Sequence, residues 1–127
     1  MGGDQEDICQ DLKDTILEFV EDLKNYVLTS EEEKGDLMLV KFFFEKQAPS
    51  RTMTHCIKHV LPNKSQIKNK NTSFFKKNLG SIFSGLPSDR VSHYSTKFQH
   101  LDKEDKDTIF KYFDTIIGLC ELHRKFK

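Results

Sequence analysis

The sequence has no tryptophan, only three cysteines, and no apolar run that approaches the roughly 18 residues of a membrane-spanning helix. The short runs exclude a membrane span, so we expect no membrane partner. The cysteines Cys9, Cys56 and Cys120 are odd in number and far apart, which predicts reduced thiols in an intracellular protein. The acidic N-terminal residues also lack the basic-then-apolar pattern of a secretory signal. Without tryptophan, the core is expected to depend on the eleven phenylalanines.

Motifs that carry catalysis are missing as well. The chain has no Gly-x-Ser-x-Gly elbow, no His-Glu-x-x-His motif and no phosphate-binding loop of the Gly-x4-Gly-Lys-Ser type. His55 and His59 are four residues apart, with Cys56 beside them, but zinc normally takes four ligands and no second Cys/His pair follows at a usable spacing. We therefore predict a protein that is not an enzyme and has no cofactor or metal, with both histidines at the surface and Cys56 as the most exposed thiol.

The net charge is zero, but the charges are unevenly distributed. Residues 1–36 contain twelve acidic and three basic side chains, residues 37–103 contain twelve basic and three acidic ones, and residues 104–127 contain five of each. Such segments can neutralise each other within one folded chain, or they can offer differently charged surfaces to partners, including a second copy of the chain. Because the basic excess is local, overall charge gives no argument for DNA binding.

Long helices are predicted at both ends of the chain. Residues 5–28 carry apolar side chains, including Phe19, at spacings of three and four, which predicts an acidic first helix. Asp102 can cap a last helix over residues 103–125, whose acidic first turn and basic last turn suit the helix dipole. This last helix has more than one apolar stripe, as expected for a core element. Its expected core residues are Phe113, Ile116, Ile117 and Cys120.

A second helix is predicted after residue 30. Ser30 and Glu33 have the spacing of a capping box. The residues that follow are apolar on nearly every side of a helix, so we expect burial on most faces, with Phe42 and Phe43 in the core. Residues 37–44 could alternatively form a buried strand, but the cap and the helical neighbours favour a helix.

Shorter helices are predicted in the middle of the chain. Ser50 is expected to cap one, and Ser88 to cap another. Residues 63–72 are polar and basic and are expected to form a loop. Another helix is predicted between this loop and the Ser88 helix. It should end at Gly85, and its expected core residues are Phe75, Leu79 and Phe83. The fold prediction is all-α: one domain over residues 1–127, built as a compact bundle of five to six helices with long first and last helices and shorter ones between.

The basic middle segment, residues 37–103, offers candidate contacts to phosphate or to an acidic partner. Phe74 and Tyr94 lie near its basic side chains, and unpaired bases stack on such rings while cations bind phosphates. Phe75, however, lies on an apolar stripe, so at least one ring belongs to the core. A solvated lysine face remains the alternative. The candidate contact residues are Lys64, Lys68, Lys70, Lys76, Lys77 and Arg90.

Residues 40–122 resemble small helical proteins encoded by large nucleocytoplasmic DNA viruses. The resemblance is strongest at IFSGLPSDRV and at DKDTIFKYFDTIIGL, which are a helix stop with its cap and a final core helix. That family has no assigned activity, so no functional residue carries over. The resemblance implies a setting in the infected cell, in the host cytoplasm or viral factory, or in the virion.

A second resemblance is to viral helical bundles that bind a death-motif helix in an apolar groove. The segment NLGSIF is similar to their Asn-Trp-Gly-Arg signature, but the Trp and the Arg are both missing.

The function prediction is a non-catalytic helical protein–protein interaction module, structural or accessory in a virus. Accessory nucleic-acid binding through residues 64–77 is the alternative, and groove binding of an amphipathic partner helix is a lesser one.

Overall fold

The computed structural model describes residues 3–82 and 86–125, without the side chains of residues 3, 4 and 76. Within these residues the protein is all-α, with long first and last helices as predicted, and it contains no strand. The elements are α1 (Gly3–Asp22), a π-helical turn η1 (Leu23–Val27), α2 (Glu31–Lys46), α3 (Pro49–His59), a 3-10 turn η2 (Leu61–Asn63), α4 (Lys64–Lys68), α5 (Ser73–Ile82), α6 (Ser88–Gln99) and α7 (Lys103–Lys125).

Two of the four serine and aspartate caps predicted at helix N-termini are present, and the helix end predicted at Gly85 lies outside the described residues. At α2, the Glu33 backbone N–H donates to Ser30 Oγ (3.1 Å) and the Ser30 N–H donates to Glu33 Oε1 (3.3 Å), which completes the capping box. At α7, Asp102 Oδ1 accepts from the Asp105 N–H at 2.9 Å. The predicted caps Ser50 and Ser88 are wrong.

Proline determines the start of both short helices instead. Pro49 occupies the first turn of α3, where its missing N–H costs nothing, and Pro87 precedes α6 in an extended conformation. Residues 63–72 are not simply a loop, because they include the one-turn helix α4. This turn brings the helices of the described residues to seven, where five to six were predicted.

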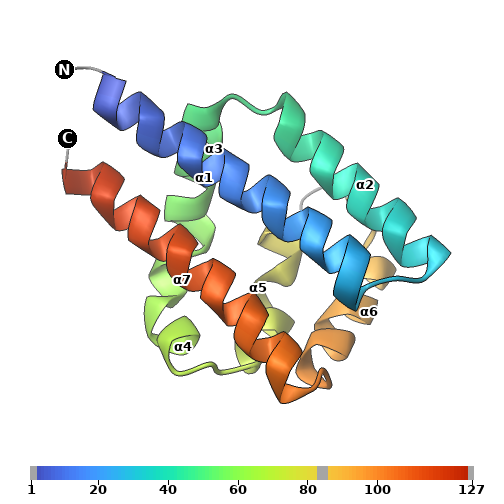
Figure 1. Cartoon of the computed structure of the whole chain (residues 1–127). Helices are drawn as coiled ribbons and strands as arrows, with labels where there is room; N and C mark the ends of the chain where they lie inside the picture. Colours follow the sequence, from blue (N-terminus) through green and yellow to red (C-terminus); the bar gives the residue numbers. More distant parts are fainter. Residues whose placement is uncertain (1–2, 83–85, 126–127) are drawn as a thin grey trace.

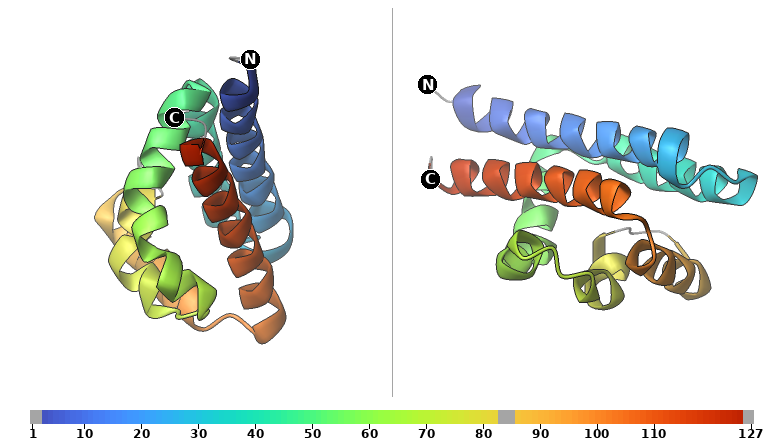
Figure 2. Two further views of the ribbon diagram at one scale, coloured as in Figure 1. Left: turned by 90° about the vertical axis from the view of Figure 1, so that its left-hand side faces the viewer. Right: turned by 60° about the horizontal axis from the view of Figure 1, so that its bottom comes forward.

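The helices lie in two layers (Figures 1 and 2). The three long helices form the first layer, in which α1 lies between α2 and α7 and runs antiparallel to both. Helices α4, α5 and α6 form the second layer, and α3 passes from one layer to the other. Helix α2 is therefore an edge of the first layer, and only part of its circumference meets the rest of the chain.

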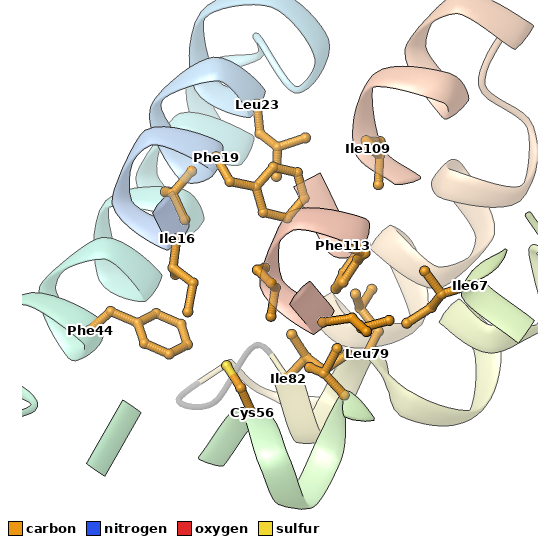
Figure 3. Packing of buried hydrophobic residues seen from close by; sticks show 14 of the residues in the cluster. Ile16, Phe19, Leu23, Phe44, Cys56, Ile67, Leu79, Ile82, Ile109 and Phe113 are labelled. Carbon is orange, nitrogen blue, oxygen red and sulfur yellow. The ribbon is translucent and has the colours of Figure 1, made fainter. Parts of the chain in front are cut away.

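One hydrophobic core joins the two layers (Figure 3). Phenylalanine supplies much of it, as expected without tryptophan: the Phe75 ring centroid lies 5.1 Å from that of Phe98 and 5.3 Å from that of Phe110. Phe113 packs edge-on against Phe19 at 5.6 Å and against Phe74 at 5.3 Å. The predicted core residues that are buried are Phe19, Phe75, Leu79, Phe113, Ile116, Ile117 and Cys120.

The prediction that α2 is buried on most faces is wrong. Phe42 is exposed, and Phe43 is only partly buried against the core. The buried residues of α2 are Glu33, Leu37, Val40 and Phe44, and their spacing of three and four residues defines a single stripe. A helix at the edge of a layer can bury only such a stripe. Phe83, the remaining predicted core residue, lies outside the described residues.

None of the helices in residues 3–82 and 86–125 combines the length and the hydrophobicity that crossing a bilayer requires.

Candidate protein interface on helix α2

The buried stripe of α2 carries a carboxylate. The Glu33 side chain is only 5 % exposed and accepts from Lys97 Nζ at 2.6 Å, while His93 Nε2 lies 3.1 Å from the same oxygen. Burial by itself would raise the pKa of the Glu33 carboxyl, but the hydrogen bonds from Lys97, His93 and Ser30 outweigh it and lower the pKa to about 2. Glu33 is thus an ionised bridge between α2 and α6.

A second polar contact joins the same two helices one turn further along α2. Asp36 Oδ2 accepts from Arg90 Nε at 2.8 Å and from the Tyr94 hydroxyl at 2.6 Å, and Arg90 also pairs with Glu32. The Asp36 carboxylate raises the pKa of Arg90, and burial together with the hydrogen bond to Asp36 raises that of Tyr94. These contacts fix the rotation of α2 about its axis, so its opposite face must point outward.

The opposite side of α2 is apolar. Met38, Leu39 and Phe42 are 60 %, 57 % and 55 % exposed, and the exposed Gly35 lies on the same side one turn earlier. We call these four residues the outer α2 face. At 100° per residue they all lie within about 50° of one line along the helix, opposite the buried stripe. Lys46 Nζ lies 4.4 Å from the Phe42 ring centroid and extends the face by one turn.

A shallow hollow of about 580 Å³ adjoins this face where α2 meets α3. Leu39, Phe42 and Phe43 line its apolar side, and Lys46 and Arg51 line its basic side. Three half-exposed large side chains present on the order of 300 Å² of apolar surface, which is the size of the largest patch on many monomers and commonly marks a binding site. The outer α2 face is therefore the candidate functional site.

The basic segment is arranged differently from an open phosphate-binding surface. Helix α4, which carries Lys64 and Lys68, lies beside α7 (Figure 1). The pairs are Lys64 with Glu121 at 2.6 Å, Lys68 with Asp114 at 3.7 Å, and Lys70 with Asp107 at 2.8 Å. Each of these lysines thus has a carboxylate partner within its own chain, so the face they form is neutralised locally.

The remaining candidate contacts do not gather into one basic surface. Arg90 is held between Glu32 and Asp36. Lys77 is exposed, and the side chain of Lys76 lies outside the described residues. The rings of Phe74 and Tyr94 are buried, so they cannot stack on bases. The structure brings four of the six predicted contact residues into ion pairs with this chain rather than into a shared site: Lys64, Lys68, Lys70 and Arg90.

The side chains of His55, Cys56 and His59 belong to the packing around α3. His55 and His59 are partly buried, with ring centroids 4.7 Å apart, and burial lowers the pKa of His55. The prediction that Cys56 is exposed is wrong: its side chain is buried and hydrogen-bonded to Cys120, since α3 packs against α7 there. Among the described residues, no three His, Cys, Asp or Glu side chains are grouped as metal ligands.

Sequence reasoning missed the outer α2 face because it expected this helix to be buried on most faces, with Phe42 and Phe43 in the core. A usable signal was present in the pattern. The stripe Glu33, Leu37, Val40 and Phe44 is complete by itself, so Met38, Leu39 and Phe42 exceed what one edge helix can bury.

Comparisons of the chain with models of protein families, with curated proteins and with solved structures found no match.

Proposed function

We propose that this protein is a non-catalytic protein–protein interaction module that binds its partner through the outer α2 face. The observation that carries the proposal is the exposure of Met38, Leu39 and Phe42 on a helix whose other side is locked to α6. Exposing apolar side chains of this size to water is unfavourable, and a partner that covers them removes this cost. The viral resemblance of residues 40–122 supports a role in a virion or an assembly complex.

Nucleic-acid binding is the weaker candidate. The ion pairs of Lys64, Lys68 and Lys70 with α7 would have to be exchanged for contacts with phosphate, so part of the gain in binding would be lost. Binding of an amphipathic helix in a groove is compatible with the proposal, because the hollow beside Phe42 is apolar on one side. The proposal does not depend on that binding mode.

The test compares the proteins captured by the wild-type chain and by surface variants. A chain carrying a proximity-labelling tag is expressed in cells together with an untagged copy, and the labelled proteins are quantified. We expect Leu39→Glu/Phe42→Glu to reduce labelling of a defined set by about tenfold or more, as for loss of central apolar contacts. Leu122→Glu is the matched control, since Leu122 is an exposed large apolar residue on α7.

Circular dichroism must show that both variants remain helical, which the exposure of the substituted side chains leads us to expect. Identical labelled sets for the wild-type chain and the double variant would overturn the proposal.

A further inference from the structure

The charges at the two ends of the outer α2 face are opposite. Glu31 and Glu32 lie at the N-terminal end, where they are exposed, and Lys46 and Arg51 lie at the C-terminal end, also exposed. An isologous dimer places the same patch of both copies in contact across a two-fold axis. When two copies of α2 lie antiparallel, the acidic end of each meets the basic end of the other, and the helix dipoles oppose each other favourably.

Resting on the proposed function, we propose that the partner of the outer α2 face is a second copy of this chain, docked as an antiparallel α2–α2 pair. The two-fold axis lies between Met38 and Leu39. In this register Met38 faces Leu39 of the partner subunit, Gly35 faces the partner's Phe42, and Glu31 faces the partner's Lys46. Each residue of the outer α2 face then contacts a residue of complementary size, and the charged residues at its two ends contact residues of opposite charge.

Gly35 is compatible with this register. A glycine within an exposed helix costs about 0.5–1 kcal/mol of helix stability relative to alanine. A Cβ at this position would meet no atom within 4 Å in the same chain, so packing within the monomer gives no reason for glycine. The partner's Phe42 ring gives one, because the absence of a side chain at Gly35 lets the ring lie directly against the helix backbone. Phe42 is the largest exposed side chain of α2 and fits this role.

The small size of the contact favours a weak, reversible association. Helix α2 is about 24 Å long at 1.5 Å per residue. A pair of such helices buries on the order of 1,000 Å² in total, which is at the low end of specific interfaces. We therefore expect a reversible dimer with a dissociation constant in the micromolar range.

The first measurement is light scattering or sedimentation of the full chain from about 1 µM to a few hundred µM, a range that brackets a micromolar dissociation constant. We expect a shift from monomer to dimer. Phe42→Glu should weaken the dimer by about tenfold or more, and Leu122→Glu should leave it unchanged. A wild-type chain that stays monomeric throughout, or a dimer that Phe42→Glu does not weaken, overturns the proposal.

The register is tested by charge reversal. Glu31→Lys and Lys46→Glu each place two like-charged pairs across the axis, so each variant should self-associate about threefold to tenfold more weakly than the wild-type chain. When the two variants are mixed, both pairs become oppositely charged again, and a heterodimer of near wild-type affinity should form at low salt. Failure of the mixture to restore association overturns the antiparallel register.

These outcomes separate the inference from the proposed function. A monomeric chain whose labelled proteins still depend on Leu39 and Phe42 refutes self-association and leaves the interaction module with a different partner. A chain that neither dimerises nor loses labelled proteins in Leu39→Glu/Phe42→Glu refutes both.

Discussion

Glu33 shows how a single buried carboxylate can couple the stability of this protein to pH. Its pKa is about 2 in the folded chain and 4.5 in an ordinary environment, so folding favours the ionised form. A depressed acid pKa gives stability that is fully present above pH 4.5 and is lost as the pH falls toward 2. The difference corresponds to at most about 3 kcal/mol in the free energy of unfolding.

We therefore predict that Glu33→Gln lowers the free energy of unfolding at pH 7 by about 1–3 kcal/mol, and that this deficit disappears near pH 2. Urea denaturation of both proteins across this range, at submicromolar concentration, measures the deficit. Glu104→Gln, which removes an exposed carboxylate from the first turn of α7, is the matched control. A deficit for Glu33→Gln that stays constant with pH would show that the carboxylate acts through shape rather than charge.

The cysteines give a second prediction at the scale of single residues. Cys9, Cys56 and Cys120 are all buried, and burial raises the pKa of Cys9, while the hydrogen bond to Cys120 and burial raise that of Cys56. Only an accessible thiolate reacts quickly with disulfide reagents. We expect an aromatic disulfide reagent to modify the native protein at the slow rate of unfolding, and all three thiols at once in denaturant. Rapid modification of a thiol in native buffer contradicts this packing.

At the scale of the helix, two glycines can be compared directly. Gly35 in α2 and Gly118 in α7 are both exposed, and at neither would a Cβ meet an atom within 4 Å. Gly35→Ala and Gly118→Ala should each raise the free energy of unfolding of the monomer by about 0.5–1 kcal/mol, because alanine restricts the unfolded chain and favours helix. Denaturation at submicromolar concentration measures both.

The same pair of variants distinguishes monomer stability from docking. Only Gly35→Ala should weaken the α2–α2 contact in the concentration series, because the added methyl group lies under the partner's Phe42. Equal dimer affinities for the two alanine variants would show that the ring does not lie over Gly35.

The sequence allowed the helices to be predicted better than their faces. The capping box at Ser30 and the cap at Asp102 are local interactions, so their spacing was sufficient to find them. The exposure of Phe42 depends on where α2 lies in the layer, and the pairing of Lys64 with Glu121 joins residues 57 positions apart. Such contacts are set by tertiary packing, which hydrophobic periodicity does not encode.

At the scale of the whole molecule, opposite charges compensate each other over the surface. The acidic first turn of α2 pairs with basic residues of α6, and the lysines of α4 pair with acidic residues of α7. The alternation of acidic and basic segments in the sequence thus leads to ion pairs between helices. The outer α2 face differs from this pattern, since its apolar residues have no counterpart in the described part of the chain.

This compensation leads to a prediction about nucleic acids. Binding that depends on phosphate neutralisation requires cations that can leave their present partners, and its affinity falls steeply with salt. Because Lys64, Lys68 and Lys70 already pair with α7, we expect no salt-sensitive binding of single- or double-stranded oligonucleotides in fluorescence anisotropy at about 50 mM salt, where non-specific binders are readily detected. Glu121→Gln/Asp114→Asn/Asp107→Asn is the matched variant, because it releases these three lysines without adding a base. Weak binding by this variant alone would show that the α7 carboxylates suppress it. Salt-sensitive binding by the wild-type chain would instead make residues 64–77 a nucleic-acid contact, and would favour that function over the protein interface on α2.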